Sequence, residues 1–338
     1  MLERRPVHLA LKILNIQQDD LVLCQDFTFV ATINPVLYEK AVPILIDSEP
    51  DTLNMCPSAL RKAIVENIAQ GKKPKSVIAV HLYGMPAKIR QIKKICDEFE
   101  IPLVEDAAEA LGSKVRDQYV GTFGDISIFS FNGNKIITTS SGGALVTDNS
   151  EWADRARYMA SQSKENVPYY QHNDIGYNYA MSNLSAGIGC GQMEVLQERI
   201  DARRSIYARY EEAFAEVEGI TFQQEYGFNL SNRWLSTIRF DCRFGDAFPF
   251  DLKKALDREG IEIRNMWKPM HLQPICSGLE KVSTKSRMLT EELFYSGICL
   301  PSGSALTKDE QEKVIDSIKK KVYGHHSEFS IPARHSVV

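Results

Sequence analysis

Several features that mark other protein classes are missing from this 338-residue sequence. Its seven cysteines are odd in number, scattered, and never arranged as Cys-x-x-Cys, which argues against a disulfide framework and a structural zinc site and favours a reducing compartment. No apolar run approaches the roughly 20 residues of a membrane span, and residues 1–14 lack the pattern of a signal peptide. We therefore expect a cytoplasmic protein with no membrane partner and no metal site.

Two further absences narrow the function. The formal net charge is −4, so no excess of basic residues indicates a nucleic-acid partner. The first predicted strand is followed by Leu23-Cys24-Gln25-Asp26 rather than by Gly-x-Gly-x-x-Gly, which counts against a dinucleotide-binding dehydrogenase.

What is present is an alternation of apolar strand-like runs with helix-like stretches. With 43% hydrophobic and 25% charged residues, the composition is that of a globular protein. The alternation predicts a three-layer αβα large domain with a mostly parallel sheet, at residues 1–199, followed by a smaller α+β domain at 200–324 and a polar tail at 325–338. The predicted strands are 21–24, 42–47, 76–81, 102–105, 126–131 and 143–147, and the clearest helices between them are 57–69 and 88–99.

Polar residues follow two of these strands. Asp106 follows residues 101–105, and Asn132-Gly133-Asn134-Lys135 follows residues 126–131. Ligand sites in open parallel sheets lie at the carboxyl ends of the strands, so a carboxylate and a lysine could face one crevice. On spacing alone, a turn with a solvated lysine and a helix-capping aspartate is the better interpretation.

The order of several motifs changes that interpretation. The sequence contains, in order, residues 105–112 (EDAAEALG), 121–124 (GTFG), 129–138 (FSFNGNKIIT), 142–147 (GGALVT) and 176–179 (GYNY). From Val7 to Val322 it resembles the DegT/DnrJ/EryC1/StrS sugar aminotransferases, a branch of the fold-type I pyridoxal-phosphate enzymes. An ordered series of motifs is far more specific than any one of them.

The resemblance implies pyridoxal 5′-phosphate as cofactor and assigns roles around it. Lys135 would carry the cofactor as a Schiff base and move a proton, and Asp106 would hold the pyridine nitrogen. Glu109 would lie against the ring, Ser130 would bind the phosphate, and Phe29 would stack on the ring. A histidine at position 135 would instead imply a dehydratase, so lysine favours amino transfer.

Three segments of the second half, at residues 231–237, 263–271 and 297–304, resemble family members that aminate UDP-4-keto-6-deoxy-N-acetylhexosamines. Arg264, His271, Arg233 and Trp267 are accordingly our substrate-binding candidates, since arginine pairs with diphosphates and tryptophan offers a flat face to a sugar or base. For Arg233 a structural role is equally open. The resemblance further implies glutamate as amino donor and a homodimer with active sites shared between subunits.

The sequence departs from the family near the cofactor phosphate. The family's phosphate loop precedes a helix that here begins near His8, where residues 2–6 read LERRP, with Arg4 at a threonine position. Family members usually read Tyr-Asn-Tyr-Arg, whereas this chain keeps Asn178 but has Ala180 at the arginine position. We therefore expect an amino-terminally truncated chain that binds the cofactor weakly. The alternative function is a catalytically impaired homologue that binds a nucleotide sugar or a partner without turnover.

Overall fold

The computed structural model describes residues 4–329, with side chains from residue 5 to residue 325. The chain divides into two units. Unit 1 comprises residues up to 201 together with 224–234 and 267–291, and unit 2 comprises 202–223, 235–266 and the residues from 292 onward.

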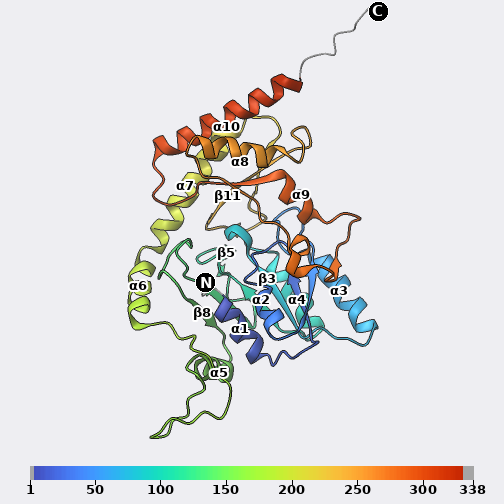
Figure 1. Ribbon diagram of the computed structural model, residues 1–338, viewed down its shortest axis with the longest axis vertical. Coiled ribbons are helices and arrows are strands. Elements are labelled where there is room, and N and C mark those ends of the chain that lie inside the picture. The colour runs from blue at the N-terminus through green and yellow to red at the C-terminus, as the bar shows by residue number, and fades with distance from the viewer. Residues whose placement is uncertain (1–3, 330–338) are drawn as a thin grey trace, which may run out of the picture. The chain divides into compact units, whose positions relative to one another are not determined.

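Unit 1 is built on a seven-stranded sheet in the order β13-β2-β1-β3-β4-β7-β8. Strands β3 and β8 of this sheet are labelled in Figure 1. Every neighbouring pair is parallel except β7 and β8, which are antiparallel. The strands are β1 (Leu21–Gln25), β2 (Val42–Ile46), β3 (Ser76–Val80), β4 (Leu103–Asp106), β7 (Ile126–Ser130), β8 (Gly143–Val146) and β13 (Lys281–Val282). All six strands predicted from the sequence are present in this sheet, and β13 is its one strand that was not predicted.

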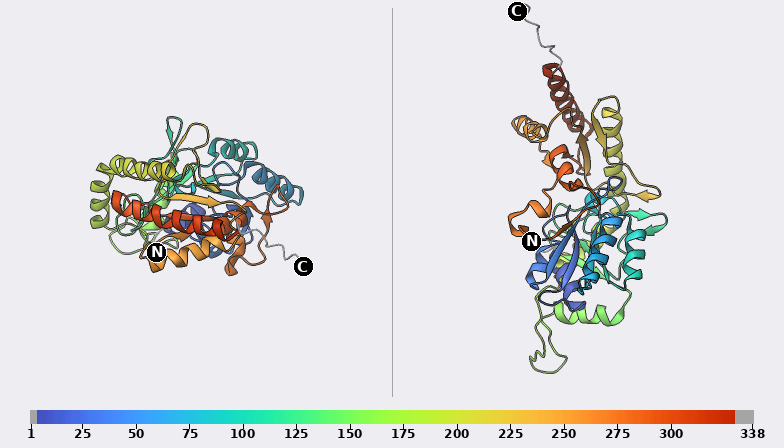
Figure 2. Two further views of the ribbon diagram at one scale, coloured as in Figure 1. Left: turned by 90° about the horizontal axis from the view of Figure 1, so that it is seen from above. Right: turned by 90° about the vertical axis from the view of Figure 1, so that its right-hand side faces the viewer.

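Both faces of this sheet are covered by helices, because its strands alternate their apolar side chains between two cores. Leu23 packs with α3 (Pro57–Ala69) and α4 (Ile89–Glu98) on one face, where these helices lie side by side (Figure 2, right). The neighbouring Val22 and Cys24 pack with α1 (Arg4–Ile13) and α2 (Asn34–Tyr38) on the other. The predicted three-layer arrangement is therefore confirmed.

The rest of unit 1 comprises α5 (Ser150–Ala160), α6 (Asn183–Glu194) and a three-stranded sheet. That sheet runs in the order β10 (Asn229–Leu230), β5 (Lys114–Val115), β6 (Gln118–Tyr119). Segments 224–234 and 267–291 return to unit 1 from the second half of the chain. This return brings motifs more than 100 residues apart in sequence into one unit.

Unit 2 has its own antiparallel sheet and core. The sheet order is β12 (Arg264–Asn265), β14 (Gly297–Leu300), β11 (Ser236–Phe240), β9 (Ile220–Phe222). Helices α8 (Phe248–Arg258) and α10 (Lys308–Phe329) pack on it, while α7 (Leu196–Phe214) crosses the boundary at residue 201 and α9 (Leu289–Ser296) the boundary at 291. The predicted polar tail begins inside α10, and its residues 330–338 lie outside the described residues. Within residues 4–329 no helix combines the length and apolar character needed to cross a membrane.

Candidate active site

Lys135 is buried at the carboxyl end of β7, with 8% of its surface exposed. The chain turns after the strand, and the Lys135 amide donates to the Asn132 carbonyl at 3.0 Å. A second bond, from the Thr139 amide to the Phe131 carbonyl at 2.9 Å, closes the loop that carries the lysine. The interpretation as a solvated turn lysine is therefore wrong, because the side chain is buried. A buried ammonium group needs neighbours that compensate for its lost hydration.

Glu109 and Trp234 contribute to that environment. The Lys135 Nζ lies 3.6 Å from Glu109 Oε1 and 4.5 Å from the centre of the Trp234 ring. The other oxygen of Glu109 accepts a hydrogen bond from the Tyr83 amide at 2.7 Å. Glu109 is itself buried. One of its carboxylate oxygens is held by the Tyr83 amide, and the other faces the Lys135 Nζ.

Asp106 ends the adjacent strand β4 and is also buried. Its Oδ2 accepts from the Thr32 hydroxyl at 2.9 Å, and its Oδ1 accepts from the Ala108 amide at 3.2 Å. The Thr32 hydroxyl also lies 2.9 Å from that of Thr28. These two donors fix the orientation of the Asp106 carboxylate at the end of β4.

Aromatic side chains gather in the same unit. Phe29, which follows β1, is 46% exposed, and its ring centre lies 5.6 Å from that of Trp267. Trp267 in turn lies edge-on to Tyr83 at 5.2 Å, and its amide donates to the Tyr83 hydroxyl at 3.0 Å. An exposed phenylalanine beside a half-buried tryptophan offers a flat apolar surface to a ring-shaped ligand.

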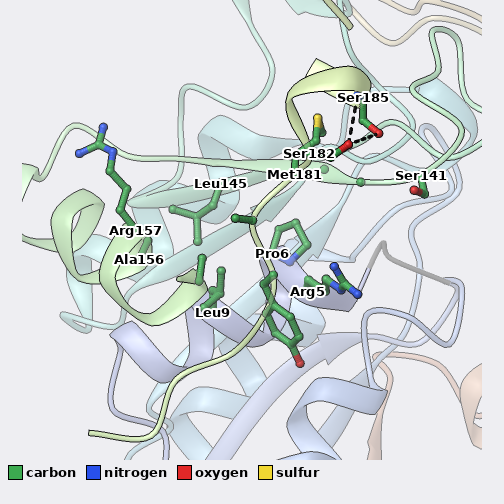
Figure 3. A pocket seen from close by; sticks show the side chains of 15 residues that line it. Arg5, Pro6, Leu9, Ser141, Leu145, Ala156, Arg157, Met181, Ser182 and Ser185 are labelled. Carbon is green, nitrogen blue, oxygen red and sulfur yellow. Dashed lines mark hydrogen bonds between the residues drawn. The ribbon is translucent and has the colours of Figure 1, made fainter. Parts of the chain in front are cut away.

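Ser130, the last residue of β7, is buried, and its hydroxyl accepts from the Asn132 amide at 3.4 Å. Its partner in the antiparallel pair is Gly143, which lines a cavity of about 370 Å³ (Figure 3). Arg5 and Pro6 from α1 also line this cavity. The Arg5 guanidinium lies 5.1 Å from the Tyr179 ring centre, so a cation lies in the wall of this cavity, which Gly143 and Leu145 of β8 also line.

Asn178 is exposed and forms a β-bridge with Ser161, next to Tyr179, which lines this cavity. Ala180, at the position where the family has arginine, lines the same cavity as Arg5. The side chain of Arg4 lies outside the part of the chain whose side chains the structure describes.

The four substrate-binding candidates occupy different environments. Arg264 lies in β12 of unit 2, with 75% of its side chain exposed and its guanidinium bonded to Glu262. Arg233 is buried in unit 1, with its Nε 4.0 Å from Glu225 and a positive φ of 51°. Trp267 belongs to the aromatic group described above.

His271 is buried between two carboxylates of unit 1. Its Nδ1 lies 2.7 Å from Asp26 Oδ2, and its Nε2 lies 3.0 Å from Glu291 Oε1. Asp26 also accepts from the Thr290 hydroxyl at 2.6 Å. Burial disfavours the charged imidazole, but the hydrogen bonds and charges of Asp26 and Glu291 outweigh it and raise the pKa of His271. Through these contacts His271 connects Asp26, at the end of β1, with Glu291 in the first turn of α9.

The main chain of the Gly121–Gly124 motif is hydrogen-bonded to the side chain of Glu105. This buried carboxylate accepts from the amides of Gly121, Phe123 and Gly124, the last two at 2.9 and 2.8 Å. His81 Nε2 lies 2.9 Å away, while His81 Nδ1 accepts from the Ala87 amide, which leaves the proton on Nε2. Burial raises the pKa of Glu105, but these donated bonds outweigh it, and the pKa is lowered. The motif is thus fixed to the strand that presents Asp106.

The sequence interpretation missed three residues that contact the candidates. Thr32 bonds Asp106, Tyr83 bonds Glu109 through its amide, and Trp234 lies against Lys135. Thr32 lies three residues after Phe29, so its proximity to the stacking candidate was a usable signal. Tyr83 carried no such signal. Trp234 lies in the segment 231–237 noted for its resemblance, but that resemblance did not indicate a contact with Lys135, because the contact depends on a chain turn far from Lys135 in sequence. Among the described residues, no group of three histidine, cysteine or acidic side chains could hold a metal ion.

Comparison with known proteins gives a consistent result. Residues 5–319 match the model of the DegT/DnrJ/EryC1/StrS aminotransferase family. EpsN of Bacillus subtilis (strain 168), whose provisional name is pyridoxal phosphate-dependent aminotransferase, is 50% identical over 311 residues, covering 92% of this chain and 79% of EpsN. GDP-perosamine synthase of Vibrio cholerae is 34% identical, covering 93% of this chain and 83% of that protein. A crystal structure of a DegT/DnrJ/EryC1/StrS aminotransferase from Brucella abortus is similar with a TM-score of 0.86 at 27% identity, covering 94% of this chain and 84% of that one.

Proposed function

Because the chain belongs to the DegT/DnrJ/EryC1/StrS aminotransferase family, we propose that it transfers an amino group from glutamate to C4 of a nucleotide-linked 4-keto-6-deoxy sugar. The observation that carries this proposal is the buried pair of Lys135 and Glu109, 3.6 Å apart, at the sheet edge where Asp106 ends β4. The product would feed polysaccharide or glycan synthesis.

The cofactor is pyridoxal 5′-phosphate, and the residues present fit it. Lys135 would carry it covalently, Asp106 would hold its ring nitrogen, and Ser130 would bind its phosphate. Phe29 would cover the ring, for which its exposed face is suited. When bound, the cofactor supplies an electron sink for the charge left by proton removal from the amino donor.

The protein's own groups prepare the proton transfers. Once released, the Lys135 amine can move a proton over a short distance, because Glu109 and Trp234 confine its end. Thr32 and the Ala108 amide hold the Asp106 carboxylate in place through one hydrogen bond to each of its oxygens. The burial of Lys135, Asp106 and Glu109 excludes water and strengthens each electrostatic contact.

For the substrate we propose a UDP-linked N-acetylhexosamine. The resemblance of residues 231–237 and 263–271 supports this choice, and Trp267 beside Phe29 provides an aromatic surface for a sugar or base. Arg264, three-quarters exposed, would pair with the diphosphate. The GDP-perosamine synthases among the relatives name a GDP-linked product, so GDP sugars form the competing substrate class.

We also propose that two copies form a homodimer with shared active sites. Helix α6 has no buried residue although it carries Leu184, Ile188 and Met193, with Leu184 84% exposed. The loop that follows α5 extends away from that helix (Figure 1). Its Tyr169 and Tyr170 are 64% and 83% exposed. Such an uncovered apolar surface is typical of an interaction site.

The test is a panel of UDP-, GDP- and dTDP-linked 4-keto-6-deoxy sugars, each incubated with glutamate and added cofactor. We expect amination of the UDP-N-acetyl substrate and no amination by Lys135→Ala. Preference for a GDP sugar would correct the nucleotide and keep the reaction. No amination of any of them, with binding of a UDP sugar retained, would favour the non-catalytic homologue.

A further inference from the structure

Trp234 makes two contacts with the lysine loop, although 100 residues separate it from that loop in sequence. Its indole Nε1 donates to the carbonyl of Asn134 at 2.9 Å, and its ring centre lies 4.5 Å from the Lys135 Nζ. Trp234 is 3% exposed and Lys135 8%, so the contact between ring and ammonium is shielded from water, while the bond to the Asn134 carbonyl is partly buried. One side chain thus touches both the main chain just before Lys135 and the far end of Lys135 itself.

Trp234 is held in turn by Asn232. The Trp234 amide donates to Asn232 Oδ1 at 2.9 Å, and the Asn232 amide nitrogen of the main chain donates to the Ser113 hydroxyl at 2.9 Å. Asn232 is completely buried, so these bonds lack competition from water. The main chain of Trp234 is therefore anchored by Asn232, a buried residue two positions earlier.

The same asparagine also holds Glu109. Its side-chain nitrogen donates to the carbonyls of Glu109 and Leu111 at 2.9 and 3.0 Å. Glu109 and Trp234, which both lie beside the Lys135 ammonium, are therefore joined through one buried amide. We infer that this link through Asn232 helps to set the distance between Glu109 and Trp234 on either side of Lys135.

We propose that Trp234 is a positioning residue for Lys135, which it holds through its indole N–H at the Asn134 carbonyl and through its ring face at the ammonium group. This inference rests on the proposed function of Lys135 as the cofactor-bearing residue. An indole ring neither donates nor accepts protons in acid–base catalysis at neutral pH, so its role is placement. Tryptophan also offers the best face for a cation among the aromatic side chains.

Two variants separate the two contacts. Trp234→Phe keeps a ring and removes the N–H, whereas Trp234→Leu removes both. Trp152→Phe is the matched control, because Trp152 packs against the apolar core on the α1 side of the sheet. The first readout is acetylation of Lys135 in cofactor-free protein by acetic anhydride, followed by peptide mass spectrometry, with Lys88 as internal reference since its side chain is only 14% exposed.

We expect a released lysine to react faster with this small reagent, by about 3- to 10-fold in Trp234→Phe and about 10-fold or more in Trp234→Leu. Lys88 should not change, nor should Lys135 in Trp152→Phe. The second readout is attachment of pyridoxal phosphate to Lys135, which should slow in the same order. Where turnover is measurable, kcat should fall while KM for glutamate changes less than about twofold.

Unchanged acetylation of Lys135 in both variants would overturn the inference. Equal acceleration at Lys135 and Lys88 would overturn it too, because it would show loosening of the whole fold. A wild-type protein that takes up no cofactor would instead count against the proposed function, and the acetylation rates would still decide whether Trp234 holds the lysine.

Discussion

At the scale of single residues, Glu109 is a buried carboxylate beside the catalytic candidate Lys135. It bonds the Tyr83 amide through one oxygen and lies 3.6 Å from Lys135 through the other. Glutamine at this position would preserve the shape and lose the charge. We expect Glu109→Gln to lower kcat by about 10- to 100-fold, since removal of one preorganised electrostatic contact in a buried site has effects of this order.

The measurement is steady-state kinetics with the sugar nucleotide that the substrate panel identifies. Glu66→Gln is the control, because Glu66 is an exposed carboxylate on α3. A Glu109→Gln variant with wild-type kcat would show that the charge beside Lys135 has no catalytic effect.

His271 gives a second residue-scale prediction, which concerns stability. The pKa of His271 is raised in the folded protein by Asp26 and Glu291, although burial opposes it. Its charged form therefore stabilises the fold fully below the ordinary histidine pKa of about 6.5, and this contribution is lost as pH rises through the higher folded pKa. We expect His271→Asn to destabilise the protein by about 3–5 kcal/mol at low pH.

Urea unfolding of both proteins across a pH series measures this difference. The difference should shrink as pH rises well above the ordinary histidine range. A difference that is constant with pH, or that grows as pH rises, would show that the charge on His271 does not contribute in this way.

At the scale of elements, the turn after β3 depends on Gly84. Gly84 has a φ of +90°, and a β-carbon there would lie 1.9 Å from Asn232 Oδ1, the atom that accepts from the Trp234 amide. Alanine would be strained in this conformation and would displace Asn232. We expect Gly84→Ala to destabilise the fold by about 2–5 kcal/mol and to loosen Lys135.

Thermal or urea unfolding provides the measurement. Gly303→Ala is the matched control, since a β-carbon at Gly303 meets nothing within 4 Å. If both variants unfold like the wild type, then the turn around Gly84 tolerates a side chain and the link through Asn232 is not rigid.

The same elements show what the sequence could and could not predict. The strands were predictable because each is a short apolar run between polar turns. Lys135 and Asp106 could be proposed as site residues because their motifs occur in a fixed order. The environment of His271 was not predictable, because its partner Asp26 lies 245 residues earlier. Trp234 was missed for the same reason, since only the return of segment 224–234 to unit 1 brings it to the lysine loop.

At the scale of the whole molecule, the uncovered face of α6 predicts self-association. Leu184 and Ile188 are one helical turn apart and both exposed, so they share a face of the helix. We expect sedimentation of the wild type as a dimer at micromolar concentration. The double variant Leu184→Glu, Ile188→Glu should be monomeric, because two charges on this face oppose its burial.

Val65→Glu is the control for this experiment, since Val65 is an exposed apolar residue on α3. It should leave the dimer unchanged. A monomeric wild type in analytical ultracentrifugation would contradict the proposal of shared active sites.

The central claim is that Lys135 carries pyridoxal phosphate, and one measurement tests it directly. The protein is incubated with the cofactor, reduced with borohydride, digested and analysed by mass spectrometry, beside Lys135→Ala as control. The account predicts a single dominant label on the peptide that contains Lys135, and its loss in the variant. A label distributed over surface lysines, or an equal label in Lys135→Ala, would contradict it.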